Sequence, residues 1–228
     1  MNQVIALLPS PLLGPAVWTP VERCFRDAGR EVIGMDYLGD PPRSPRDVSE
    51  AFETGVPHNR HVILLPHSNA GLYVPQLIAQ RQIVATVFID AGLPPAAGTV
   101  PLAPPGLVDH LATLADDEGI LPPWTQWFDE QEVAPLFPDA ATRAKVEAEQ
   151  HRLPLTYFQS MMDVPGGWID HPAAYLGFGD TYAQEQQQAN QWNWPVEVIG
   201  GHHLHMLVDP DLVTRHLIAL IDGLLDQD

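Results

Sequence analysis

The sequence predicts an α/β fold in which helices cover both faces of a doubly wound, mainly parallel sheet of about six strands. Two observations carry this prediction. Six short segments are almost continuously apolar, as strands buried on both faces are, and helical patterns separate most of them. These segments are residues 4–8, 31–35, 61–65, 85–89, 174–178 and 196–199.

The helical patterns carry recognisable start and stop signals. In the first helix we expect Thr19 as the N-cap and Glu22 to complete a capping box. Pro20 suits the first helical position and Gly29 the end of the helix. We expect the last helix to begin at Pro210. Strands that alternate with helices imply right-handed crossovers and hence parallel pairing.

One interval breaks this alternation. Between the fourth and fifth apolar segments lie about eighty residues rich in proline and aromatics, whereas such connections usually have ~2–6 residues. We therefore expect residues 1–92 and 171–228 to form the core and residues 93–170 to form an inserted helical lid.

Aromatic side chains inside this insertion suggest a pocket. Trp124, Trp127 and Phe128 lie close together in the sequence, and a helical lid would use such rings to line an apolar substrate pocket. The alternative, that they form the insertion's own small core, has about equal weight for any one ring.

Composition excludes several classes of partner. The formal net charge is −18 at pH 7, which repels nucleic-acid phosphates and anionic membrane surfaces. No apolar run approaches the ~18 residues of a membrane span. The first residues do not resemble a signal peptide, and the single Cys24 agrees with a reducing compartment. We expect a cytoplasmic protein that acts on a small molecule. Its oligomeric state stays open, with a homodimer as one alternative.

Chemistry is expected at the end of the third apolar segment, in PHSNAG (residues 66–71). A predicted strand precedes Ser68 and a helical pattern follows it, as at the G-x-S-x-G turn that exposes a nucleophilic serine. Ala70 supplies the small residue that this turn needs and Gly71 helps. Pro66 replaces the usual glycine, but its fixed φ suits the end of a strand.

Four short motifs follow one another along the chain: SPLLGP (10–15, with Trp18), HS-x-AG (67–71), DAGLP (90–94) and GGH-L-H-M-L-V-D-P (200–210). At these motifs the chain resembles the α/β-hydrolase superfamily over essentially its whole length, and in particular small actinobacterial-type members. The resemblance implies an α/β-hydrolase fold. It is less specific for the substrate, because the superfamily includes esterases, thioesterases, lyases, epimerases and inactive relatives.

The resemblance also implies a base. In the superfamily the catalytic histidine commonly precedes a proline by seven positions, and Pro210 then selects His203. Only an imidazole with a pKa near neutrality can take the serine proton and return it to the leaving group. The acid that orients it stays open between Asp90 and Asp180, since both satisfy the chain order Ser, Asp, His.

Two backbone N–H groups must meet the developing oxyanion. Asn69, directly after the serine, would supply one of them. The other is expected from the loop after the first strand, where Pro11 cannot donate, so Leu12 or Leu13 is the candidate, with Leu12 preferred.

A metal site is a weaker alternative. The histidines at positions 202, 203 and 205, together with Asp209, could ligate zinc. Since no companion signature such as HExxH accompanies them, we expect neither a metal nor an organic cofactor.

The leading prediction is therefore a serine hydrolase that cleaves an ester or thioester of a small, largely apolar molecule through an acyl-enzyme. The alternative is a non-hydrolytic enzyme of specialised metabolism, such as a lyase, cyclase or epimerase, with His203 as the acid and base. A ligand-binding module without catalysis is disfavoured because serine, histidine and aspartate are all present in the expected order.

Overall fold

The structure of the chain, a computed structural model, describes residues 3–37 and 41–226. These residues form a six-stranded parallel sheet in the order β2-β1-β3-β4-β7-β8. Each strand overlaps one of the six apolar segments, so the predicted sheet is confirmed. The strands are β1 (Gln3–Leu8), β2 (Val32–Gly34), β3 (His61–Ser68), β4 (Ile83–Ala91), β7 (Ala173–Phe178) and β8 (Val196–Ile199).

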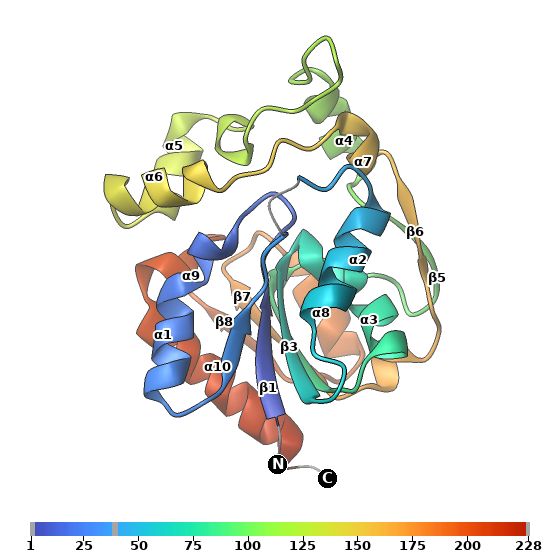
Figure 1. Cartoon of the computed structure of the whole chain (residues 1–228), viewed down its shortest axis with the longest axis vertical. Helices are drawn as coiled ribbons and strands as arrows, with labels where there is room; N and C mark the ends of the chain where they lie inside the picture. The colour runs from blue at the N-terminus through green and yellow to red at the C-terminus, as the bar shows by residue number, and fades with distance from the viewer. Residues whose placement is uncertain (1–2, 38–40, 227–228) are drawn as a thin grey trace.

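Helices cover both faces of this sheet (Figure 1). On one face α10 packs against β4 and β7, and α1 packs against α10 and β2. On the other face α2 packs against α3, and α8 packs against β7 and β8. The helices are α1 (Thr19–Asp27), α2 (Pro45–Gly55), α3 (Val74–Gln80), α8 (Ala183–Gln191), α9 (His205–Val208) and α10 (Pro210–Leu225).

The sheet is also the hydrophobic core. Residues 62–65 of β3 are at most 2% exposed, although consecutive side chains of a strand point to opposite faces. Both faces of β3 are therefore dry, and this explains why such a central strand appears in the sequence as an apolar run. Burying each such Val, Ile or Leu side chain contributes about 1.5–3 kcal/mol relative to leaving it exposed.

The expected capping box at the first helix is wrong. A 3₁₀ turn at residues 15–17 runs directly into α1, so the N-cap is Trp18, in a helical conformation and without a side-chain cap. The N–H of Trp18 donates to Pro15 O at 2.9 Å, and the N–H of Glu22 donates to Trp18 O at 2.8 Å. The 3₁₀ turn therefore provides hydrogen bonds at the start of the helix, which is the role of a side-chain cap. A capping box is present instead at α2, between Ser44 and Asp47.

The predicted ends of two helices are confirmed. Gly29 follows α1 with a φ of 73°, a left-handed conformation that glycine adopts without a steric penalty. The last helix, α10, begins at Pro210, and the carboxylate of Asp209 accepts a hydrogen bond from the Leu212 N–H at 2.9 Å.

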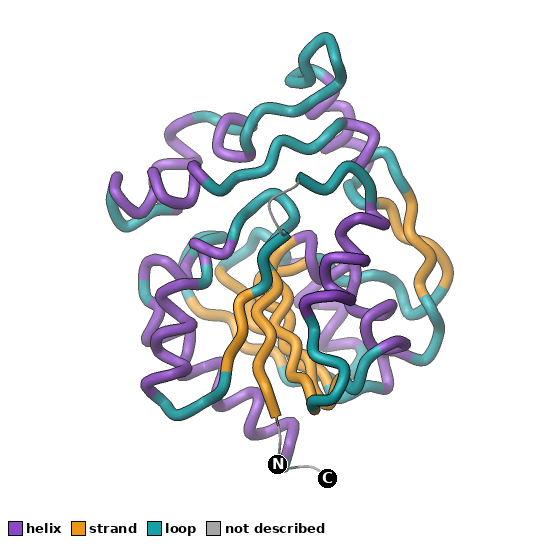
Figure 2. Tube along the Cα trace, in the orientation of Figure 1, coloured by secondary structure: helices purple, strands orange, loops and turns teal. Residues whose placement is uncertain are grey.

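The segment between β4 and β7 lies mainly beyond one end of the sheet (Figure 1). It is not wholly helical, because β5 and β6 form an antiparallel ribbon that sequence patterns did not predict. Figure 2 shows this ribbon running down the flank of the molecule. The elements are β5 (Gly98–Pro101), α4 (Pro105–Ala112), α5 (Glu130–Val133), α6 (Ala140–Ala148), α7 (Leu155–Phe158) and β6 (Met161–Val164), with 3₁₀ turns at 124–126, 134–136 and 168–170.

None of the helices in the described ranges is long and apolar enough to cross a membrane.

The chain after β3 passes very close to the chain after β4. A Cβ atom added to Gly71 would lie 2.2 Å from the carbonyl oxygen of Gly92 and 3.1 Å from Cβ of Ala91. Since the nearest obstacle is backbone, the neighbour cannot move aside as a flexible side chain could. This position therefore requires glycine for close packing.

We expect Gly71→Ala to lower the free energy of unfolding by about 1–3 kcal/mol, the usual cost of overpacking a tight site. Gly106→Ala is the matched control, because a Cβ there meets nothing within 4 Å. Urea denaturation of both variants measures the difference. Equal stabilities would contradict the close approach.

Candidate active site

Ser68 stands on a sharp turn between β3 and a 3₁₀ turn, Asn69–Tyr73, that leads into α3. Its φ is 58° and its ψ is −130°, a conformation that non-glycine residues rarely adopt. Such backbone costs on the order of 1–3 kcal/mol and persists only where the surroundings enforce it. Here Ser68 pairs with Ala91 of β4, and its carbonyl oxygen accepts a hydrogen bond from Gly92 N–H at 3.0 Å.

Pro66 does not interrupt this strand. β3 continues through Pro66 to Ser68, and Pro66 is in register with Leu8 of β1. The proline therefore occupies the usual glycine position of the turn while the serine still reaches the strand end.

His203 lies on the loop after β8, and its Nδ1 is 2.6 Å from Oδ2 of Asp90. Asp90 is fully buried at the end of β4, where its other oxygen accepts the Phe178 N–H at 3.0 Å. A carboxylate can only accept, so Nδ1 of His203 carries the hydrogen and Nε2 is left as the basic nitrogen.

Asp180 lies elsewhere. It is exposed, contributes to the wall of the cavity described below, and its backbone oxygen accepts the Ala183 N–H at 3.2 Å. Of the two aspartates that the sequence left open, Asp90 is therefore the one in contact with the His203 ring.

His67, directly before Ser68, supports the loop that carries His203. Its Nε2 donates to the backbone oxygen of His203 at 3.0 Å, and the two rings stack with centroids 4.5 Å apart. The Nδ1 atom of His67 is buried without a hydrogen-bond partner. Burial, and then the neighbouring His203, hold the pKa of His67 well below its ordinary value. This contact had no signal in the sequence.

The hydroxyl of Ser68 has a second neighbour that the sequence did not indicate. It lies 3.3 Å from the hydroxyl of Tyr182, in a hydrogen bond where either oxygen can donate. The Tyr182 ring lies 5.6 Å from the His203 ring. Tyr182 precedes α8, and a tyrosine in a loop carries no motif that would distinguish it.

The two residues expected to supply oxyanion donors, Asn69 and Leu12, line the same cavity as Ser68. Asn69 is the first residue of a 3₁₀ turn, where backbone N–H groups lack partners within the turn. Leu13 N–H is occupied, since it donates to Ser10 O at 2.8 Å. Leu12 N–H has only a long contact of 3.4 Å to Ser10 Oγ, so it is the more available of the two.

The side chain of Asn69 ties this turn to the inserted segment. Its Nδ2 donates to Leu102 O at 2.9 Å, and its Oδ1 accepts from the Tyr157 hydroxyl at 2.6 Å. The Tyr157 hydroxyl also lies 2.7 Å from that of Tyr73, beside the turn. The insertion is thus hydrogen-bonded to the residue whose N–H would meet an oxyanion.

A cavity of about 770 Å³, here called the Ser68 cavity, opens beside Ser68 and His203. The three predicted aromatics all line it: Trp124 lies 5.9 Å from the His203 ring, Trp127 is 4% exposed and Phe128 is 42% exposed. Trp127 also packs on Phe158, so this ring belongs both to the wall and to the insertion's own core. The lining contains carboxylates but no lysine or arginine among the described residues.

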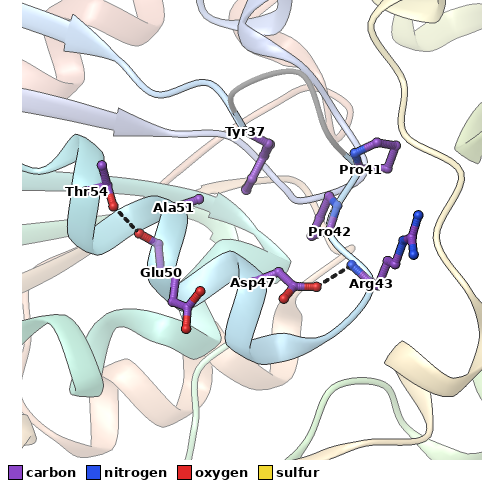
Figure 3. Close-up of a pocket in the computed structure, with 8 residues that line it drawn as sticks. All are labelled: Tyr37, Pro41, Pro42, Arg43, Asp47, Glu50, Ala51 and Thr54. Atoms are coloured by element: carbon purple, nitrogen blue, oxygen red, sulfur yellow. Dashed lines mark hydrogen bonds between the residues drawn. The ribbon is translucent and has the colours of Figure 1, made fainter.

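A second hollow of about 410 Å³ lies beside α2 (Figure 3). Several of its polar groups form hydrogen bonds with neighbouring residues of the same hollow. The Arg43 backbone N–H donates to Asp47 at 2.7 Å, and the Thr54 hydroxyl donates to Glu50 O at 2.8 Å. Serine, cysteine and histidine are missing from its described lining, so we do not regard it as a catalytic site.

Within the described part of the chain, no three His, Cys, Asp or Glu side chains gather as a metal site requires. The residues of the alternative zinc site have other contacts. His203 is bound to Asp90, His205 packs edge-on against Phe178, and Asp209 caps α10.

No protein-family model matches the chain, and a search of curated proteins gave no match. Solved structures do match it along nearly its whole length. An extracellular α/β-hydrolase from a Paenibacillus species has a TM-score of 0.74 at 16% identity, over 96% of this chain and 98% of that one. Polyneuridine aldehyde esterase has a TM-score of 0.71 at 17% identity, over 97% and 99%.

Tomato methylketone synthase I has a TM-score of 0.68 at 15% identity, over 98% of this chain and 99% of that one. At identities this low the likeness concerns the course of the chain, not the substrate. Together with the parallel six-stranded sheet, the strained serine turn and the insertion after β4, these matches establish that the chain has the α/β-hydrolase fold.

Proposed function

We propose that this protein is a serine hydrolase that cleaves an ester or thioester of a small, largely apolar molecule through an acyl-enzyme. The observation that carries the proposal is the pairing of a strained, cavity-facing Ser68 with a His203 whose Nδ1 is 2.6 Å from the buried Asp90. Structures with the same fold include proteins described as esterases and hydrolases, which supports this class of reaction.

Acylation begins when Nε2 of His203 takes the Ser68 proton as the oxygen attacks the substrate carbonyl. The serine hydroxyl, which is hydrogen-bonded to Tyr182, must first turn towards His203. Asp90 stabilises the imidazolium that forms. The N–H groups of Asn69 and Leu12 donate to the oxyanion, and each such donor is worth about 10²–10³ in rate.

The tetrahedral intermediate then collapses. The bond between the carbonyl carbon and the leaving oxygen or sulfur breaks, and His203 delivers its proton to the leaving group. In the second half-reaction His203 takes a proton from water, whose oxygen attacks the acyl carbon. The bond between that carbon and Ser68 Oγ then breaks, and His203 returns the proton to Oγ, which restores the starting state. Every proton moves through His203, so the cycle needs no metal or organic cofactor.

The lining of the Ser68 cavity favours a neutral or cationic substrate. Asp180 and Glu185 lie on one side, no described lysine or arginine lines the cavity to hold an anion, and the chain carries a net charge of −18. Partial burial raises the pKa of Glu185 above its usual value. Trp124 and Phe128 offer rings to the apolar part of the substrate.

One observation favours a second candidate, a non-hydrolytic lyase, cyclase or epimerase with His203 as acid and base. The hydroxyl of Ser68 is hydrogen-bonded to Tyr182, and in such an enzyme the serine would hold the substrate without attacking it.

A fluorophosphonate probe tests covalent catalysis directly. We expect one adduct per chain in intact-protein mass spectrometry, and none in a Ser68→Ala control, because only an activated serine displaces fluoride at useful rates. An adduct that persists in the control, or no adduct in the unmodified protein, would overturn the hydrolase proposal.

The two aspartates form a matched pair of variants. With a p-nitrophenyl ester, we expect Asp90→Asn to lower kcat by about 10³–10⁴-fold through loss of imidazole orientation, and Asp180→Asn to lower it by less than about 3-fold. Steady-state kinetics of both variants give the comparison. A larger loss in Asp180→Asn would reverse the assignment.

His67 makes stability depend on pH. Because its pKa in the folded chain lies well below the 6.5 of the unfolded chain, the unfolded state binds more protons as the pH falls below that value. The free energy of unfolding therefore falls by up to about 1.4 kcal/mol per pH unit, and this contribution is fully present only above that pH. His67→Gln keeps a donor for His203 O and should weaken this dependence. Urea denaturation at about pH 7 and about pH 5.5 tests it, and an unchanged dependence would refute it.

A further inference from the structure

Tyr182 is a polar group in the Ser68 cavity to which the proposed triad assigns no role. Its hydroxyl lies 3.3 Å from Ser68 Oγ and its ring lies 5.6 Å from the His203 ring. It lines the same cavity as both residues. The Tyr182 hydroxyl therefore contacts the serine oxygen that would attack the substrate.

The sheet order determines from which side Tyr182 approaches. β1 flanks β3 on one side, whereas β4, β7 and β8 follow on the other. Leu12 comes from the loop after β1, so one oxyanion donor approaches from that side. Tyr182 follows β7 and His203 follows β8, so both approach from the opposite side.

This asymmetry matters for bond cleavage. The carbonyl oxygen of the substrate must face the oxyanion donors, while the leaving group must face the histidine that protonates it. The Tyr182 hydroxyl lies on the histidine's side of Ser68, and therefore where the leaving oxygen departs.

We propose that Tyr182 is a catalytic residue that donates a hydrogen bond to the leaving-group oxygen as its bond to the carbonyl carbon breaks. This inference rests on the proposed hydrolase function. The bonding electron pair passes to the leaving oxygen, His203 supplies the proton, and the phenol keeps its own. Tyr182 thus stabilises the charge that develops before the proton arrives.

The protonation state of the phenol agrees with a donor. Burial raises the pKa of Tyr182 well above its usual value, and the charges of Asp90 and Glu185 add to this effect. At neutral pH the side chain therefore carries its hydrogen. It cannot act as the base for Ser68, and this leaves proton transfer to His203.

A donor at the leaving oxygen has a specific kinetic signature. A p-nitrophenolate is already stable, so it gains little from the hydrogen bond, whereas more basic phenolates and alkoxides gain more. Removing only the Tyr182 hydroxyl should therefore make the rate depend more steeply on the pKa of the leaving group. A substitution that merely disturbed packing would slow all esters alike.

The test is Tyr182→Phe with butyrate esters of one acyl group and graded leaving groups, from p-nitrophenyl through p-methylphenyl to ethyl. We expect kcat/KM to fall on the order of 100-fold for the most basic leaving group, and less than about 3-fold for p-nitrophenyl. The rate of fluorophosphonate labelling should change little, because fluoride departs without such help.

Tyr37→Phe is the matched control. Tyr37 is also a buried phenol, and its hydroxyl donates to Pro9 O at 2.7 Å, but it does not line the Ser68 cavity. We expect the slope of log kcat/KM against leaving-group pKa to be unchanged in this variant.

The possible outcomes distinguish a failure of the role of Tyr182 from a failure of the hydrolase proposal. Equal losses on all esters, or no loss on any, with labelling of Ser68 intact, would overturn the role of Tyr182 and leave the hydrolase proposal standing. Absence of labelling in the unmodified protein would overturn both. A slope that steepens in Tyr182→Phe alone would support the proposal.

Discussion

The pairing of β3 with β4 is the constraint on which the candidate site depends. Adjacent strands lie about 4.8 Å apart. Here each has a non-glycine residue with positive φ near its carboxyl end: Ser68, the last residue of β3, at 58°, and Asp90, the last but one of β4, at 40°. The ladder continues to the pair of Ser68 with Ala91, and Gly92 N–H then holds the Ser68 carbonyl. Gly71 leaves room for the two chain turns to pass each other. The side chains of Ser68 and Asp90 are thereby fixed at the carboxyl end of the sheet by backbone hydrogen bonds.

The remaining groups reach this end of the sheet from separate parts of the chain. His203 arrives from the loop after β8 and is held at its ring by Asp90 and at its backbone by His67. The insertion is fastened to the same end through the side chain of Asn69. The turn that carries Ser68 is therefore hydrogen-bonded to the insertion.

Sequence patterns predicted the central strands because those strands are buried on both faces, and a strand buried on both faces must be largely apolar. The edge strands β2 and β8 are partly exposed, and they were found as short segments that are apolar at most positions. They were less informative wherever a local signal competed with a tertiary contact. The prediction of Thr19 as the N-cap was wrong because the preceding 3₁₀ turn already supplies the start of the helix with hydrogen bonds. The ribbon of β5 and β6 is only partly buried, and each strand has four residues, with alternating burial in β6 alone. This is too little to distinguish the ribbon from a proline-rich connection.

Local periodicity and short motifs were enough to predict the parallel sheet, a sharp turn at Ser68, the loop that carries His203 and a long segment between the fourth and fifth strands. Only the tertiary structure decided that Asp90 contacts His203, that His67 supports its loop and that Tyr182 touches the serine hydroxyl. Asp90 and Asp180 both follow strands in the right chain order, so the order could not distinguish them. The contacts of His203 and Tyr182 join residues more than a hundred positions apart, and such distances are set by the folded sheet.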